Sequence, residues 1–207
     1  MSDNEKEEKK FTSKLYTKTG DKGTSALYNG ERRPKNDTFF HALGSIDELS
    51  ACIGVALEYC IIDKNGLEPY LERIVGVMLD VGACIATPLD NSQEKYIKKT
   101  KLDDRKYVET IERWIDTIDS QLPPLKFFII PCNVGLASSH LHVARSVCRR
   151  AEREVVGLTK FGLVPEVVAI FINRLSDFLF AAARYAAMKS GKDEAYWTSK
   201  GTNFDDI

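Results

Sequence analysis

The sequence lacks the features that would place the protein in a membrane or in an oxidising compartment. No apolar run approaches the roughly 20 residues that a membrane-spanning helix needs. Residues 1–10 are charged rather than apolar, so we expect no secretory or organellar presequence. The five cysteines, Cys52, Cys60, Cys84, Cys132 and Cys148, form no CxxC pair and mostly lie within apolar periodic runs. They are expected to be buried free thiols in a reducing, intracellular compartment.

Candidates for metal or nucleophilic chemistry are also scarce. His140 and His142 are two residues apart and would point about 200° away from each other on a helix, while His41 is isolated. The Glu-x-x-His pairs of di-iron bundles and the spacing of a Walker A loop are missing. No Ser-His-Asp or Cys-His arrangement is evident, although side chains distant in the sequence could meet in the fold. We therefore expect cations, hydrogen-bond donors and aromatic rings to carry the function.

Length and charge limit the remaining possibilities. A chain of 207 residues with 43% hydrophobic content is expected to form one domain with a substantial core. The net charge of −1 argues against wholesale nucleic-acid binding, so any basic site should be local. We expect a disordered charged tail over residues 1–13, one domain over 14–191 and a C-terminal tail over 192–207.

Apolar residues recur at intervals of three and four in five stretches, each of which is predicted to be a helix. These stretches are 38–60, 69–87, 103–120, 136–160 and 165–190. Thr38 is expected to cap the first helix, and Pro165 is expected to start the last. Residues 89–102 are polar and are expected to form an exposed, mobile loop, and the proline-bracketed segment 122–131 to be extended. The predicted fold is all-α, a five-helix up-and-down bundle of the ferritin-like kind.

A row of arginines distinguishes the fourth predicted helix. Arg145, Arg149 and Arg153 recur every four residues and would stack along one side of it. Solvated arginines often cover a bundle surface with their apolar stems. Guanidinium groups also match phosphate oxygens bidentately, which favours an anion site. This helix alone leaves both interpretations open.

The segment 16–35 is rich in glycine, hydroxyl groups and lysine. Gly20 and Gly23 would allow close backbone approach, and Lys18, Lys22 and Lys35 add positive charge, a composition that suits a phosphate-binding loop. A flexible lead-in has much the same composition. Composition does not decide between the two.

Five segments in order resemble the PduO-type ATP:corrinoid adenosyltransferases, the cob(I)alamin adenosyltransferase family. They read 16-YTKTGDKGTSALYNGERRPK-35, 43-LGSIDELSACIG-54, 121-QLPPLKFFIIP-131, 145-RSVCRRAEREVV-156 and 171-FINRLSDFLFAAARYAAMKSG-191. The resemblance spans residues 14–191 and implies a homotrimer of five-helix bundles, with ATP bound between subunits and the corrinoid in an adjoining pocket. It implies that Co(I) of the reduced corrinoid attacks the 5′ carbon of ATP, which yields adenosylcobalamin and triphosphate. A corrinoid nucleophile would fit the missing protein nucleophile.

The resemblance also implies a set of ATP-binding residues, with Mg²⁺ accompanying ATP. They are Thr17, Lys18, Thr19, Gly20, Ser25, Ala26 and Lys35 in the loop 14–35, Arg149, Arg150, Ala151, Glu152 and Arg153 in the arginine helix, and Asn173. No metal-ligating residue is identified.

Four further roles follow from the resemblance. Arg149 and Arg153 are expected to be catalytic, and Asp47 to pair with Arg149 across the subunit interface. Arg145 is expected to support the integrity of the site. Phe128 is expected to crowd the lower face of the corrin, which favours loss of the lower axial ligand and makes Co(II) easier to reduce to Co(I).

One departure and several alternatives accompany this hypothesis. The turn 132-CNVG-135 is less glycine-rich than in the family and lengthens the spacing to the arginine helix by one residue, which affects the corrinoid pocket rather than the ATP site. The alternative function is a catalytically idle sensor or carrier that binds nucleotide or corrinoid. A nucleic-acid-binding bundle is supported by the arginines alone. Candidate partners are a corrinoid reductase and an adenosylcobalamin-dependent mutase. The compartment is expected to be the mitochondrial matrix for an animal protein whose presequence is absent, and the cytoplasm otherwise.

Overall fold

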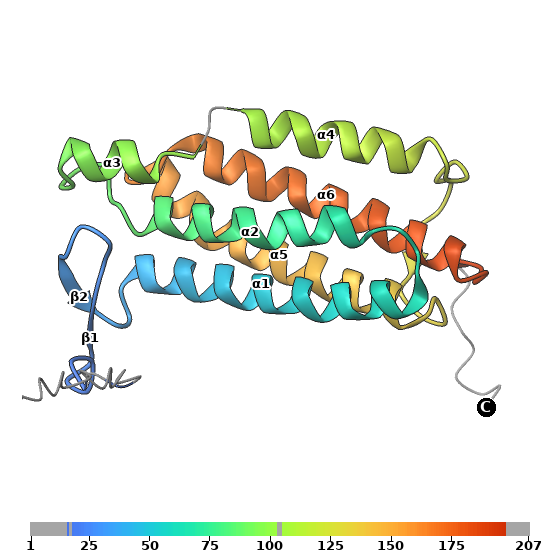
Figure 1. The fold of residues 1–207 in the computed structure, drawn as a ribbon, viewed down its shortest axis with the longest axis horizontal. Coiled ribbons are helices and arrows are strands. Elements are labelled where there is room, and N and C mark those ends of the chain that lie inside the picture. The colour runs from blue at the N-terminus through green and yellow to red at the C-terminus, as the bar shows by residue number, and fades with distance from the viewer. Residues whose placement is uncertain (1–15, 17, 103–104, 198–207) are drawn as a thin grey trace, which may run out of the picture.

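Helices make up most of the chain in the computed structural model, which describes residues 16, 18–102 and 105–197 (Figure 1). The helices are α1 (Thr38–Asp63), α2 (Glu68–Ile85), α3 (Glu94–Thr100), α4 (Lys106–Asp119), α5 (Leu136–Lys160) and α6 (Glu166–Lys189). The five longer ones run roughly side by side as a bundle. In this bundle α5 packs against α1 and α6, α2 packs against α1, and α4 packs against α6. The prediction of an all-α bundle is confirmed.

The core consists of the apolar stripes that the sequence pattern predicts. In α5 the predicted stripe is fully buried, and it comprises Leu141, Ala144, Cys148, Ala151 and Val155. The predicted stripes of α1, α2 and α6 are buried in the same way. Because each helix buries one stripe, its opposite face stays available for polar side chains.

The segment 89–102 was predicted wrongly as a loop, since it contains α3. This helix is short and polar, with an ion pair of 2.6 Å between Lys98 Nζ and Glu94 Oε1 one turn apart. The ring of Tyr96 meets that of Tyr28 edge-on, with 6.0 Å between centroids. A helix of seven residues shows too few turns for its apolar period to be recognised.

The predicted helix ends differ from the observed ones by a few residues. Asp37, rather than Thr38, caps α1, because its carboxylate accepts a hydrogen bond of 2.9 Å from the main-chain N–H of Phe39. Pro165 precedes α6 instead of starting it. Such shifts reflect local capping rather than the apolar pattern.

Four short strands form two ribbons in the described chain. β1 (Thr24–Ala26) and β2 (Arg32–Pro34) form an antiparallel hairpin before α1. β3 (Ile129–Ile130) pairs antiparallel with β4 (Ala195–Tyr196), so the chain folds back after α6. Phe127 and Phe128, just before β3, are both exposed. The predicted tail 1–13 lies outside the described residues.

All five cysteines are free thiols, but their burial differs from the prediction. Cys60, Cys84 and Cys148 are buried, Cys52 is half-buried, and Cys132 is exposed because it lies in the turn that follows β3 rather than in a helix. Within the described ranges, no helix combines the length and the apolar character that crossing a membrane demands.

Candidate functional site

The three arginines of the predicted row lie along α5 but have different surroundings. Arg145 is half-buried, with its guanidinium carbon 5.6 Å from the centroid of the Phe180 ring. Burial, and then the charge of Arg149, lower the pKa of Arg145. Arg149 and Arg153 are exposed, and Nη1 of Arg153 donates a hydrogen bond of 2.9 Å to the main-chain carbonyl of Arg149. The guanidinium group of Arg153 therefore lies against the main chain of Arg149.

Arg149 and Arg153 line a hollow on the surface between α5 and α6. Its lining also includes Glu152, Val156 and Asn173, and its volume is about 390 Å³. The side-chain amide of Asn173 donates a hydrogen bond of 2.8 Å to Glu152 Oε1, which fixes both side chains at the edge of the hollow. In the described part of the chain neither arginine forms an ion pair. Unpaired guanidinium groups at a hollow favour an anionic ligand.

Two other members of the run 149–153 face away from this hollow. Arg150 forms an ion pair with Glu48 of α1, and this hydrogen bond raises the pKa of Arg150. Ala151 is buried in the core. Asp47, the neighbour of Glu48, is exposed and forms no ion pair with a described residue of its own chain. The carboxylate that meets the arginine helix within one chain is thus Glu48, a role that the sequence pattern did not assign.

The hairpin brings several residues of the predicted loop together. A Cβ atom added to Gly20 would lie 3.1 Å from Nζ of Lys35, so the lysine ammonium group lies directly against this glycine. Arg32 Nη2 donates hydrogen bonds to the carbonyls of Thr19 at 2.7 Å and Thr24 at 3.1 Å. Arg32 thereby folds the loop onto β1. The sequence does not predict this role, because composition alone does not distinguish Arg32 from the other polar residues of the loop.

The remaining loop residues lie nearby. Lys18 has a left-handed backbone conformation, with φ of 57°. Ser25 faces Arg33 in the β1–β2 ladder, and Ala26 is exposed at the end of β1. Thr17 lies outside the described residues. The loop therefore presents a lysine, a glycine and main-chain groups on one small surface.

The hairpin is attached at the N-terminal end of α1, beyond the helical bundle (Figure 1). Leu27 is buried, and the N–H of Tyr28 donates a hydrogen bond of 2.9 Å to the carbonyl of Ala86, just after α2. No hairpin residue lines the hollow next to Arg149 and Arg153. Among its described residues, a single chain thus does not bring together the two halves of the predicted ATP site.

Phe128 has a fixed main chain and a free ring. The residue is 80% exposed, and its carbonyl accepts a hydrogen bond of 2.8 Å from the N–H of Trp197. In the following turn, Asn133 and Gly135 have positive φ values of 59° and 86°. Asparagine tolerates this conformation better than most residues, so the turn keeps a glycine-like path with fewer glycines.

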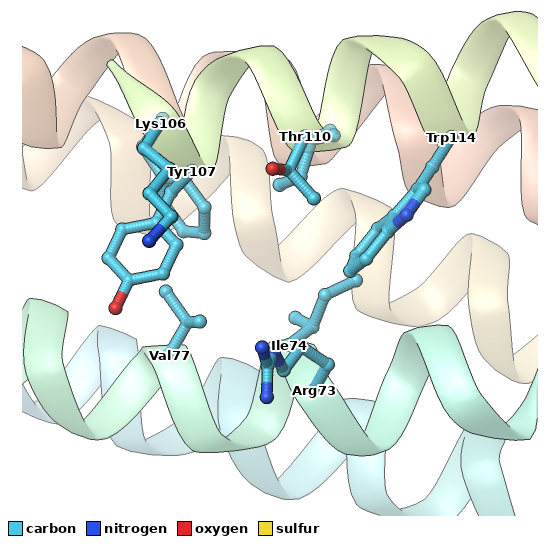
Figure 2. A pocket seen from close by; sticks show the side chains of 9 residues that line it. Arg73, Ile74, Val77, Lys106, Tyr107, Thr110 and Trp114 are labelled. Carbon is cyan, nitrogen blue, oxygen red and sulfur yellow. The ribbon is translucent and has the colours of Figure 1, made fainter. Parts of the chain in front are cut away.

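A second hollow lies between α2 and α4, with Phe171 of α6 also in its lining (Figure 2). Figure 2 shows Arg73 and Val77 on one side and Tyr107, Thr110 and Trp114 on the other. Its lining contains no residue of α5 or of the hairpin and none of the predicted site residues. Among the described residues, no group of three or more His, Cys, Asp or Glu side chains could hold a metal ion.

Comparison with known proteins identifies the family. The family model described as cobalamin adenosyltransferase matches residues 15–186. The chain belongs to the cobalamin adenosyltransferase family. The corrinoid adenosyltransferase MMAB of Mus musculus is 50% identical over 181 residues, which cover 87% of this chain and 76% of the mouse protein. The corrinoid adenosyltransferase of Bacillus subtilis is 38% identical over 181 residues, covering 86% of this chain and 89% of that protein.

Solved structures of the family share the fold. A phenylalanine-to-alanine variant of the PduO-type ATP:corrinoid adenosyltransferase from Lactobacillus reuteri, complexed with cobalamin and ATP, gives a TM-score of 0.81 at 34% identity. The match covers 89% of this chain and 99% of that chain. An arginine-to-lysine variant of the same enzyme, complexed with ATP, gives a TM-score of 0.80 at 35% identity, with 89% and 100% coverage. The resemblance seen in the five sequence segments is confirmed.

Proposed function

We propose that the protein is an ATP:corrinoid adenosyltransferase, which transfers the 5′-deoxyadenosyl group of ATP to Co(I) of a reduced corrinoid and releases triphosphate. The observation that carries this proposal is that two guanidinium groups without ion partners, those of Arg149 and Arg153, line one hollow. A related enzyme of the same family has been solved in complex with cobalamin and ATP. ATP and cobalamin are thus the substrates.

The chemistry makes modest demands on the protein. The reduced corrinoid brings its own electron pair, which forms a bond to the 5′ carbon while the bond from that carbon to the triphosphate oxygen breaks. The leaving triphosphate takes the bonding electrons and gains negative charge. Arg149 and Arg153 would stabilise that charge, and Asn173 and Glu152 would hold the nucleotide beside them. The chain therefore aligns two substrates and neutralises a leaving group.

We place the active site between subunits of a homotrimer. Within one chain, no described hairpin residue lines the arginine hollow, and Asp47 and Arg149 are both exposed without an ion partner among the described residues. A hairpin from the neighbouring subunit, with Lys18, Thr19, Gly20 and Lys35, would supply the other half of the ATP site. Asp47 of one subunit would orient Arg149 of the next.

Mixing two inactive variants would test this arrangement. Lys35→Ala would impair only the hairpin half of each site, and Arg149→Ala only the arginine half. If sites form between subunits, trimers reassembled from both variants contain some intact sites and regain part of the activity. Activity that stays at the level of the separate variants would show that each chain builds its own site.

Phe128 is the residue that we assign to the corrinoid. Its ring is exposed, and its main chain is held by the hydrogen bond from Trp197. A ring that crowds a planar ligand needs both properties. Crowding the lower face would displace the lower axial ligand and ease reduction of Co(II). Mg²⁺ would accompany the triphosphate of ATP, where it is held largely by phosphate oxygens. A corrinoid reductase and an adenosylcobalamin-dependent mutase are the proposed partners, in a reducing compartment that suits five free thiols.

The decisive experiment is an anaerobic assay with chemically reduced cobalamin, ATP and Mg²⁺. We expect the Co(I) spectrum to disappear as one triphosphate is released for each light-sensitive alkylcobalamin formed. ATP binding without turnover would contradict the enzyme and support the idle sensor or carrier. Release of pyrophosphate or phosphate as the first product would contradict the leaving group proposed here.

A further inference from the structure

Arg184 is a buried cation that lies outside the arginine row. It lies on α6 with only 3% of its side chain exposed. Its Nε donates a hydrogen bond of 2.8 Å to Glu194 Oε1, and its Nη2 lies 3.2 Å from Glu194 Oε2. The side chain of Glu194 is itself only 10% exposed. This bidentate pair fixes the chain after α6 to the helix.

The same guanidinium group holds a second segment. Its Nη2 donates a hydrogen bond of 2.8 Å to the carbonyl of Pro123, and its Nη1 lies 3.9 Å from Asp119 at the end of α4. Pro123 begins the extended segment that leads to Phe128. One buried side chain therefore joins the C-terminal segment to the segment that carries Phe128.

These two segments also pair with each other. Ile129 faces Tyr196, and Ile130 faces Ala195, in the ribbon of β3 and β4. Next to this ladder, the N–H of Trp197 donates a hydrogen bond of 2.8 Å to the carbonyl of Phe128. Glu194 immediately precedes β4, and Phe128 immediately precedes β3. The position of the Phe128 main chain thus depends on a ribbon that Arg184 anchors next to β4, through Glu194, and on a segment that Arg184 holds at Pro123.

We propose that Arg184 is a positioning residue for Phe128: through Glu194, Pro123 and the ribbon of β3 and β4, it holds the exposed ring where it crowds the corrinoid. The inference rests on the proposed function and on the role assigned there to Phe128. The ring makes little contact with the described residues of its own chain, so we infer that its main chain determines its placement. A ribbon of two residue pairs is too short to be stable without such an anchor.

The test separates reduction from transfer. Arg184→Met should lower the rate with cob(II)alamin and reduced flavin as electron donor by about 10- to 100-fold, the range that a misplaced group produces. With preformed Co(I), the rate should change much less. In the EPR spectrum of the enzyme with cob(II)alamin and ATP, splitting from the lower nitrogen ligand should persist in the variant and be lost in the wild type.

A double variant shows whether Arg184 acts through Phe128. In the Phe128→Ala background, Arg184→Met should cause no further loss of the Co(II)-dependent rate, because the ring that it positions is absent. Additive losses would overturn the proposal. Arg174→Met serves as a matched control, since Arg174 is ion-paired on the same helix to Glu112 and Asp177 without contacting the ribbon.

A second pair of variants avoids disturbing a buried charge. Trp197→Pro removes the main-chain N–H that donates a hydrogen bond to the carbonyl of Phe128. Proline should fit here, because Tyr196 lies in a strand and the residue before a proline prefers an extended conformation. Trp197→Ala removes the ring but keeps the N–H. The proline variant alone should reproduce the selective loss with Co(II) and the persistent nitrogen splitting. Equal behaviour of both variants, or equal losses with Co(I) and Co(II), would overturn the proposal, whereas an inactive wild type would overturn the proposed function instead.

Discussion

Arginines on adjacent helices of this bundle have opposite surroundings. Arg149 and Arg153 on α5 are exposed at a hollow and lack an ion partner among the described residues, whereas Arg184 on α6 is buried and satisfied by Glu194 and Pro123. A buried cation that is paired with a carboxylate has little left to offer a ligand, and an exposed one without an ion partner contributes little to folding. We therefore propose that the first group serves binding, whereas the second serves structure.

The sharpest test of this contrast is Arg149→Ala. We expect kcat/KM to fall by about 10²- to 10³-fold, because a donor to the developing charge is lost. The free energy of unfolding should be unchanged, since the side chain is exposed. Triphosphate release and urea unfolding of the same preparation measure both. Arg113→Ala, an exposed arginine on α4, is the control, and full activity of Arg149→Ala would remove its assigned role.

The converse test is Glu194→Ala. It leaves the Arg184 guanidinium buried without its carboxylate, so the free energy of unfolding should fall by about 3 kcal/mol. Urea unfolding with protein at a fixed concentration measures the loss. Arg184→Met in the same background should recover part of it, because the unpaired charge is then gone. A Glu194→Ala variant as stable as the wild type would mean that the pair contributes nothing net.

The burial of Arg145 is intermediate between that of Arg149 and that of Arg184. The protonation of the nearby His142 depends on the charge of Arg145. Burial, and then the positive charge of Arg145, lower the pKa of His142 from 6.5 to about 4. Between these values the unfolded chain takes up a proton that the folded chain does not, so stability falls as the pH falls through this window. At 1.36 kcal/mol per pKa unit, the loss at pH 4 is about 3 kcal/mol.

Comparing wild type with His142→Gln isolates this contribution. Urea unfolding at pH 7 and at pH 4.5 should show a larger loss of stability for the wild type, because the variant has no imidazole to protonate. The carboxylates titrate in both proteins and cancel in the difference. Identical pH dependence in the two proteins would contradict a neutral, buried His142.

The smallest effect is expected for the Arg150–Glu48 pair, an exposed counterpart of Arg184–Glu194. Solvent screens such a pair, so Glu48→Gln should leave the melting temperature unchanged. KM for ATP should stay within about twofold, since Arg150 faces away from the hollow. Kinetics over a range of ATP concentrations checks this. A large rise in KM would show that Glu48 orients Arg150 toward the nucleotide.

The sequence alone predicted the features that repeat along a helix. The buried stripes and the row Arg145, Arg149 and Arg153 follow the helical period, and both are where that period puts them. Features that join distant segments were not predictable. Arg184 lies among buried alanines, and its partner Glu194 lies in a polar stretch that resembles a tail, so nothing local marks the pair.

The candidate site shows the same limit. The hairpin residues and the arginines were recognised as two segments of one family site, yet within the described chain they stay apart. Periodicity cannot specify contacts between subunits. Arg32, which organises the loop through the carbonyls of Thr19 and Thr24, was missed because main-chain acceptors leave no trace in a sequence.

The two tryptophans give the protein separate optical reporters of its core and of its C-terminal ribbon. Trp114 packs against Tyr70 and Phe178, with centroid distances of 5.1 and 6.0 Å, so its emission will follow unfolding of the bundle. Trp197 is exposed next to Phe128, where an absorbing corrin would quench its emission. A Trp197→Phe variant would separate the two signals, so corrinoid arrival and loss of the fold could be timed independently in one unlabelled chain.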